Sequence, residues 1–110
     1  MKLNASLAQS AVLFAALGDP TRLTLVARLA RGEPLSITRL AEGGTISRQA
    51  ITKHLHVLAG AGLVESSRQG REQLWELNPR QLAEARRCLD LIGAQWDSAL
   101  ARLKASLEAE

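Results

Sequence analysis

The sequence predicts one mainly α-helical domain that carries a single β-hairpin, and three observations support this fold class. Apolar residues recur in steps of three and four along most of the 110 residues, which places them on one face of a helix. Capping residues and glycines divide this pattern into five segments. Two short stretches around residues 69–71 have the alternation of a hairpin. Because a chain of this length is too short for two independent cores, one domain over residues 1–110 is expected.

The first two helices are expected before Gly18 and between residues 20 and about 30. Asp19 suits the cap of the second helix, and Pro20 suits its first turn, where no amide hydrogen is needed. The apolar stripe of the first helix consists of Leu3, Leu7, Ser10, Phe14 and Leu17, and that of the second of Leu23, Val26, Ala27 and Leu29.

Two serines are expected to cap the next two helices. Ser36 precedes a short third helix that is anchored by Leu40 and broken at residues 43–44, and Ser47 precedes a longer fourth helix. The glycines within residues 60–62 are typical of a left-handed turn at the end of that helix.

The remainder of the chain is expected to form the hairpin and a long last helix. Strands are predicted at 63–68 and 72–77, and Pro79 opens the helix. An apolar stripe of this length suits pairing with another helix, and it consists of Leu82, Ala85, Leu89, Ile92, Trp96, Ala99, Leu103 and Leu107.

Composition and charge restrict the class of protein. No apolar run approaches the roughly 18 residues that a membrane span needs, nothing at the N-terminus resembles an export signal, and the single Cys88 excludes an internal disulfide, so a cytoplasmic protein is expected. Residues 43–73 hold four cations, two anions and both histidines, whereas residues 74–110 hold five cations and six anions. An anionic partner is therefore expected to bind the first two thirds of the chain.

The expected fourth helix has the character of a DNA-reading helix. Its apolar face is formed by Ile51, Leu55 and Leu58, so the opposite face presents Gln49, Lys53 and His56, with Thr52 on the flank. A short helix, a tight turn and a second helix rich in hydrogen-bond donors form a helix-turn-helix, whose second helix enters the major groove, and the hairpin would be its wing. The predicted fold is thus a winged helix-turn-helix.

Five short stretches, in order, resemble the ArsR-type winged-helix repressors, the arsenical-resistance regulator family. They are LGDPTR at 17–22, ISRQAITKHL at 46–55, AGLV at 61–64, GRE at 70–72 and WEL at 75–77. The resemblance, which covers about residues 12–77, implies a repressor that binds double-stranded DNA as a homodimer through its first and last helices. The last helix also resembles that of a metal-independent branch, which has a tryptophan near the position of Trp96.

Chemistry assigns expected roles within this interface. Gln49 and Arg48 are the candidates for base reading, because Gln pairs with adenine and Arg with guanine. Phosphate or mixed contacts suit Ser47, Thr52 and Lys53. His54 lies beside the apolar face, so a structural histidine and a DNA contact are equally open. The full predicted DNA-binding set is Ser36, Thr38, Ser47, Arg48, Gln49, Thr52, Lys53, His54, His56, Arg68 and Arg71.

A two-fold dimer would offer two reading helices to successive major grooves, about 34 Å apart, and would select an inverted-repeat operator. Bound over a promoter, such a dimer would block polymerase. The predicted interface residues are Leu7, Phe14, Leu89, Ile92, Trp96 and Leu103.

No metal or other cofactor is expected. Family members that sense metals use cysteines in the third helix or Asp and His residues in the last helix, but residues 35–40 contain no thiol and the last helix contains no histidine. Cys88 is interpreted as a packed cysteine rather than a redox sensor, and Trp96 as core or interface rather than the lining of an effector pocket. A small-molecule effector remains an open alternative. The turn at residues 43–45, which has two glycines, is expected to be looser than is usual in the family.

Two other functions are alternatives to DNA binding. A winged-helix module that binds only an acidic protein partner is the main alternative. An enzyme is disfavoured, because the sequence shows neither paired carboxylates in a plausible cleft nor a nucleophile beside a base.

Overall fold

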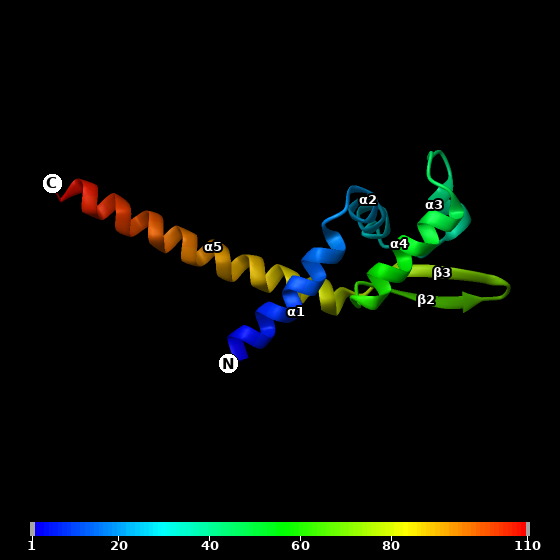
Figure 1. Ribbon diagram of the computed structural model, residues 1–110, viewed down its shortest axis with the longest axis horizontal. Coiled ribbons are helices and arrows are strands. Elements are labelled where there is room, and N and C mark those ends of the chain that lie inside the picture. Colours follow the sequence, from blue (N-terminus) through cyan, green and yellow to red (C-terminus); the bar gives the residue numbers. More distant parts are fainter. Residues whose placement is uncertain (1, 110) are drawn as a thin grey trace.

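The computed structural model describes residues 2–109, and within that range it describes side chains from residue 7 onward, so the side chain of Leu3 lies outside the described part. The predicted mainly helical fold with a β-hairpin is confirmed (Figure 1). Over the described residues the elements are α1 (Lys2–Leu17), α2 (Pro20–Leu29), β1 (Leu35–Ser36), α3 (Ile37–Ala41), α4 (Arg48–Gly60), β2 (Val64–Gln69), β3 (Glu72–Leu77) and α5 (Pro79–Glu108).

Side-chain caps begin four of the helices, and three of these caps were predicted. Asp19 Oδ2 accepts a hydrogen bond from the backbone nitrogen of Arg22 at 3.0 Å, and Ser36 and Ser47 cap α3 and α4 in the same way. Asn78, which was not predicted, caps α5. These bonds satisfy amides that have no partner inside their own helix, so local sequence sets where each helix starts.

The expected glycine turn at the end of α4 is also confirmed. Gly62 has a φ of 78°, a left-handed conformation that costs glycine little. The backbone nitrogen of Leu63 then reaches back to the carbonyl of Leu58, which ends the helix and turns the chain into β2.

The strands form a small antiparallel sheet in the order β1-β3-β2. Val64 pairs with Leu77 and Gln69 with Glu72, so the wing is a regular hairpin. The third strand, β1, was not predicted, because two residues are too few to show an alternating pattern. It pairs Leu35 with Trp75 and so attaches the start of α3 to the base of the wing.

The buried face of α1 differs from the predicted stripe. Ser10 and Leu17 are at least partly buried as expected, but Leu13 and Ala16 complete the covered face, while Leu7 is exposed and Phe14 is only partly buried. Apolar residues surround this helix, so their spacing does not select one face. The covered face is the one that packs against the rest of the domain.

The buried face of α2 also differs from the predicted set of apolar residues. Leu25, Val26 and Leu29 are buried, whereas Leu23 and Ala27 are exposed. Leu25 was missed because it lies beside Val26 in the sequence and outside a strict step of three or four. The two adjacent residues share the covered face because neighbouring helices reach both of them.

The core joins all parts of the molecule except the distal half of α5. Leu82 and Ala85, in the first two turns of α5, pack against the core, but every residue from 89 to 109 is exposed. Figure 1 shows this half of α5 projecting from the rest of the domain. With distal α5 included, the molecule measures 68 × 32 × 21 Å. The buried core consists of Leu13, Ala16, Leu25, Val26, Leu29, Leu40, Ile51, Leu55, Leu58, Leu63, Val64, Trp75 and Ala85.

Candidate nucleic-acid interface

Helix α4 has the two-faced arrangement that the sequence predicted. Ile51, Leu55 and Leu58 are buried in the core, and this fixes the rotation of the helix about its axis. Gln49 and Lys53 are therefore exposed on the other side. Arg48 is exposed in the first turn, beside the Ser47 cap. The predicted base-reading and phosphate-binding residues thus lie at the N-terminal end of α4, where free amides and the helix dipole also favour an anion.

Backbone hydrogen bonds shape the start of the turn between α3 and α4. The nitrogens of Glu42 and Gly44 donate to the carbonyls of Arg39 and Ala41, at 3.2 and 3.3 Å. Gly43 between them has a φ of 72°, so glycine suits this position.

A side chain of α2 braces the start of this turn. The Arg28 guanidinium donates to the carbonyls of Leu40 at 2.7 Å and Arg39 at 3.1 Å. Both carbonyls belong to the last turn of α3, and that of Arg39 also accepts from the backbone nitrogen of Glu42. Helix α3 is thereby attached to α2, and the turn that was expected to be loose has a support that its glycine content did not reveal.

The hydroxyl groups of the predicted interface differ in what they can offer a phosphate. Ser47 Oγ accepts from the backbone nitrogen of Ala50, so its own proton is free to be donated. Thr52 Oγ1 instead donates to the carbonyl of Arg48 at 2.8 Å, so its proton is already used within the helix. In this conformation Ser47 is suited to donate to a phosphate and Thr52 is not.

The structure brings the start of α3 and the wing together. Arg68 and Arg71 are exposed at the end of the hairpin, next to the two-residue turn 70–71. Ser36, Thr38 and Arg71 help to line one shallow hollow of about 250 Å³. Residues that are more than 30 positions apart in the sequence therefore line one hollow between the start of α3 and the wing.

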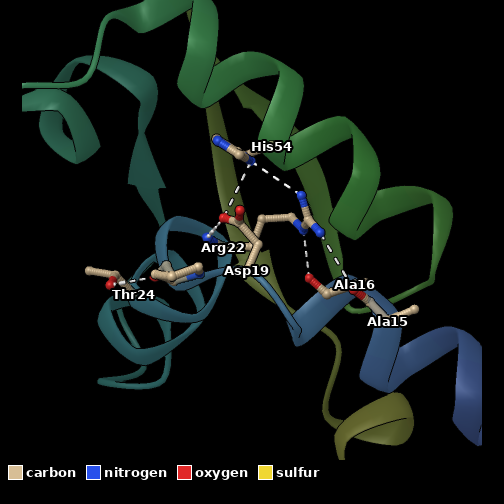
Figure 2. Close-up of polar contacts among 7 residues, drawn as sticks. Ala15, Ala16, Asp19, Arg22, Thr24 and His54 are labelled. Carbon is tan, nitrogen blue, oxygen red and sulfur yellow. Dashed lines mark hydrogen bonds and ion pairs between the residues drawn. The ribbon is translucent and has the colours of Figure 1, made fainter.

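The two histidines have different surroundings. His56 is exposed, and its ring centroid lies 6.2 Å from that of Trp75 at the base of the wing. His54 is partly buried, and its Nδ1 lies 3.5 Å from Nη1 of Arg22 and 3.9 Å from Oδ2 of Asp19 (Figure 2). The sequence did not reveal this contact, because 32 positions separate Arg22 from His54.

The carboxylate in this cluster is stabilised in its charged form. The hydrogen bond from the backbone nitrogen of Arg22 is the main cause that lowers the pKa of Asp19 below its ordinary value of 3.8. The positive charge of Arg22 and a protonated His54 act in the same direction, whereas desolvation opposes them. Asp19 is therefore an anion at neutral pH.

No group of three or more His, Cys, Asp or Glu side chains in the described part of the chain is arranged to hold a metal ion. Cys88 is partly buried, in the first half of α5. Within residues 2–109, none of the helices combines the length and the apolar character that crossing a bilayer requires.

Comparisons with known proteins agree with this arrangement. A family model described as a helix-turn-helix domain matches residues 17–67. The HTH-type transcriptional regulator Rv2034 of Mycobacterium tuberculosis is 41% identical over 85 residues, which are 77% of this chain and 76% of that protein. A solved ArsR-like transcriptional regulator from Rhodococcus sp. RHA1 has 42% identity and a TM-score of 0.78, and the match covers 91% of this chain and 93% of that one.

A second solved structure is a homodimer. It is the winged helix-turn-helix DNA-binding domain of Mb0332 from Mycobacterium bovis, described as a possible ArsR-family regulator. It has 25% identity and a TM-score of 0.64, and the match covers 86% of this chain and 83% of that one.

Proposed function

Because the chain belongs to the ArsR-type family of winged helix-turn-helix transcriptional regulators, we propose that it acts as a homodimeric repressor on an inverted-repeat operator. The predicted class of protein, a DNA-binding regulator and not an enzyme, is confirmed by its relatives. They also favour DNA binding over a module that binds only proteins. We place its action in the cytoplasm and assign no effector.

The observation that carries the proposal of a dimer is the unpartnered apolar row on α5. Leu89, Ile92, Trp96 and Leu103 are each at least half exposed and lie along one side of the helix. Leu7, exposed on α1, and the partly buried Phe14 extend the proposed interface. A row of this kind is unfavourable in water and is typical of a protein interface. The homodimeric relative from M. bovis supports a second copy of this chain as its occupant.

A two-fold dimer would present two copies of α4 to one side of a duplex. We assign base reading to Arg48 and Gln49, and phosphate binding to Ser47 and Lys53, because these side chains are exposed at the N-cap and in the first two turns of α4. The arginines of the wing, Arg68 and Arg71, would bind the backbone or the minor groove beside it. The recognition helices would then enter successive major grooves, about 34 Å apart.

Titration of DNA affinity with salt, combined with sedimentation, tests this proposal. The probes are a duplex selected for tightest binding from a random library and a pool of random-sequence duplexes of the same length. If the dimer neutralises about six to eight phosphates, the slope of log K against log salt should be near −6 for the selected duplex. A monomer at micromolar concentration, or a flat response to salt, would contradict the proposal.

A further inference from the structure

One arginine side chain connects three helices of this molecule. Arg22, in the first turn of α2, donates through Nε to the carbonyl of Ala16 at 2.6 Å and through Nη2 to that of Ala15 at 3.4 Å. Both carbonyls belong to the last turn of α1, where carbonyls have no partner inside the helix. That of Ala15 also accepts from the backbone nitrogen of Gly18 at 3.2 Å. The remaining arm of the guanidinium, Nη1, faces Nδ1 of His54 on the recognition helix (Figure 2).

His54 is placed between a donor and an acceptor. When Nδ1 carries no proton, it can accept from Nη1 of Arg22 at 3.5 Å. Oδ2 of Asp19, at 3.9 Å, is within ion-pair distance of the same nitrogen but beyond hydrogen-bond distance. The imidazole therefore lies against the junction of α1 and α2. Figure 2 shows the other ring nitrogen pointing away from Asp19 and Arg22.

We infer that Arg22 and His54 are positioning residues that set the direction of α4 relative to α1, and that His54 acts on DNA recognition through this contact rather than by binding a phosphate. The inference rests on the proposed function, since α1 contributes to the proposed dimer interface. A link from α1 to α4 then sets the angle and spacing of the two recognition helices.

The location of the cluster separates this role from general support of the fold. Ile51, Leu55 and Leu58 already hold α4 in the core, and the side chains of His54 and Asp19 remain 25% and 32% exposed at its edge. Loss of the contact should leave the fold in place and let α4 change direction. Affinity for the selected duplex, which needs the two recognition helices at the right spacing, should fall more than affinity for random-sequence duplexes.

A double-mutant cycle on DNA affinity tests the inference. We expect Arg22→Gln and His54→Ala each to lower the affinity for the selected duplex about tenfold, and the double variant to lower it little further, because both remove one shared contact. Affinity for random-sequence duplexes should change less than about twofold. The salt slope of His54→Ala should equal that of the wild type, because no phosphate contact is lost.

Matched variants keep the test decisive. His54→Asn, whose amide can take the place of Nδ1, should recover most of the affinity. Val57→Ala is the control for an exposed side chain of the same helix that lies outside the predicted DNA-binding set. Circular dichroism checks that each variant is folded. If Arg22→Gln does not fold, Arg22→Lys replaces it, since lysine can still reach a carbonyl of α1 but cannot also bind His54.

Three outcomes would overturn the inference: effects of Arg22 and His54 that multiply, a salt slope that falls in magnitude by about 2 per dimer in His54→Ala, or wild-type affinity in both single variants. In each case the wild type still binds the selected duplex, so the proposed function stands. If the wild type binds no duplex, it is the proposed function that fails.

Discussion

Helices α4 and α5 bury their apolar residues in different ways. In α4, the 13 residues of Arg48–Gly60 have one apolar side, which the core of the same chain covers. In α5, the 30 residues of Pro79–Glu108 pack on the core only through their first turns, and the apolar row from 89 onward is exposed. The position of α4 is therefore set within one chain, whereas the apolar row of distal α5 would be covered only in the proposed dimer.

This difference separates stability of the fold from assembly. Distal α5 is a helix of about 20 residues without tertiary contacts, so it lacks the packing that supplies most of the stability of helices in proteins. We expect its helicity to depend on protein concentration, while the packing of α4 should not.

The largest effect is expected when the buried side of α4 is truncated. Leu55 is fully buried, so Leu55→Ala should lower the free energy of unfolding by about 2–5 kcal/mol through lost burial and a new cavity. Urea unfolding monitored by circular dichroism measures the change. Val57→Ala, on the exposed side of the same helix, is the control and should change it by less than about 0.5 kcal/mol. Equal losses in the two variants would show that α4 is not held by this face.

Truncation on distal α5 should act on the dimer. Ile92→Ala removes two apolar side chains per dimer and should weaken dimerisation by about 3 kcal/mol, or roughly 100-fold in the dissociation constant. Leu91→Ala is the matched control, because Leu91 is also exposed but lies off the row. Sedimentation equilibrium measures both variants. A larger effect from Leu91 would place the interface on another face of α5.

The exposed side of α4 should divide base reading from phosphate binding. Gln49→Ala should cost about 1–3 kcal/mol on the selected duplex and relax preference at particular base pairs. Lys53→Ala should weaken all sequences alike and reduce the magnitude of the salt slope by about 1 per protomer. Anisotropy titrations with single-base variants of the duplex measure the DNA affinity of both protein variants. If both variants weaken every sequence equally, the assigned roles are wrong.

The smallest effect on stability is expected from the carboxylate of Asp19, the N-cap of α2. Since its pKa is lowered on folding, its charge stabilises the fold above the unfolded pKa, and this stabilisation is lost as pH falls through the folded pKa. Asp19→Asn keeps an oxygen for the cap but loses the charge. The variant should be less stable than the wild type at pH 7, and the difference should shrink between about pH 5 and pH 2. Thermal unfolding across this pH range measures the difference in stability between the two proteins. A difference that did not change with pH would show that the charge of Asp19 is not its cause.

Much of the fold and the polar face of α4 followed from local sequence. The caps at Asp19, Ser36 and Ser47 and the turn at Gly62 depend on groups a few residues apart, so their chemistry can be recognised without a structure. The face of α4 followed from helical spacing, since its apolar residues occupy one side only.

Other features required the packed chain. Strand β1 exists because Leu35 meets Trp75, and the covered side of α1 was chosen by its neighbours among several apolar sides. The role of His54 was open until the structure placed it beside Arg22 and Asp19.

The sequence by itself determined where the helices begin and end and which residues of α4 and α5 share a side, because periodicity and capping act within a few residues. Only the tertiary structure decided which of these sides is covered. That choice depends on residues brought together from distant parts of the chain, as Arg22 and His54 are.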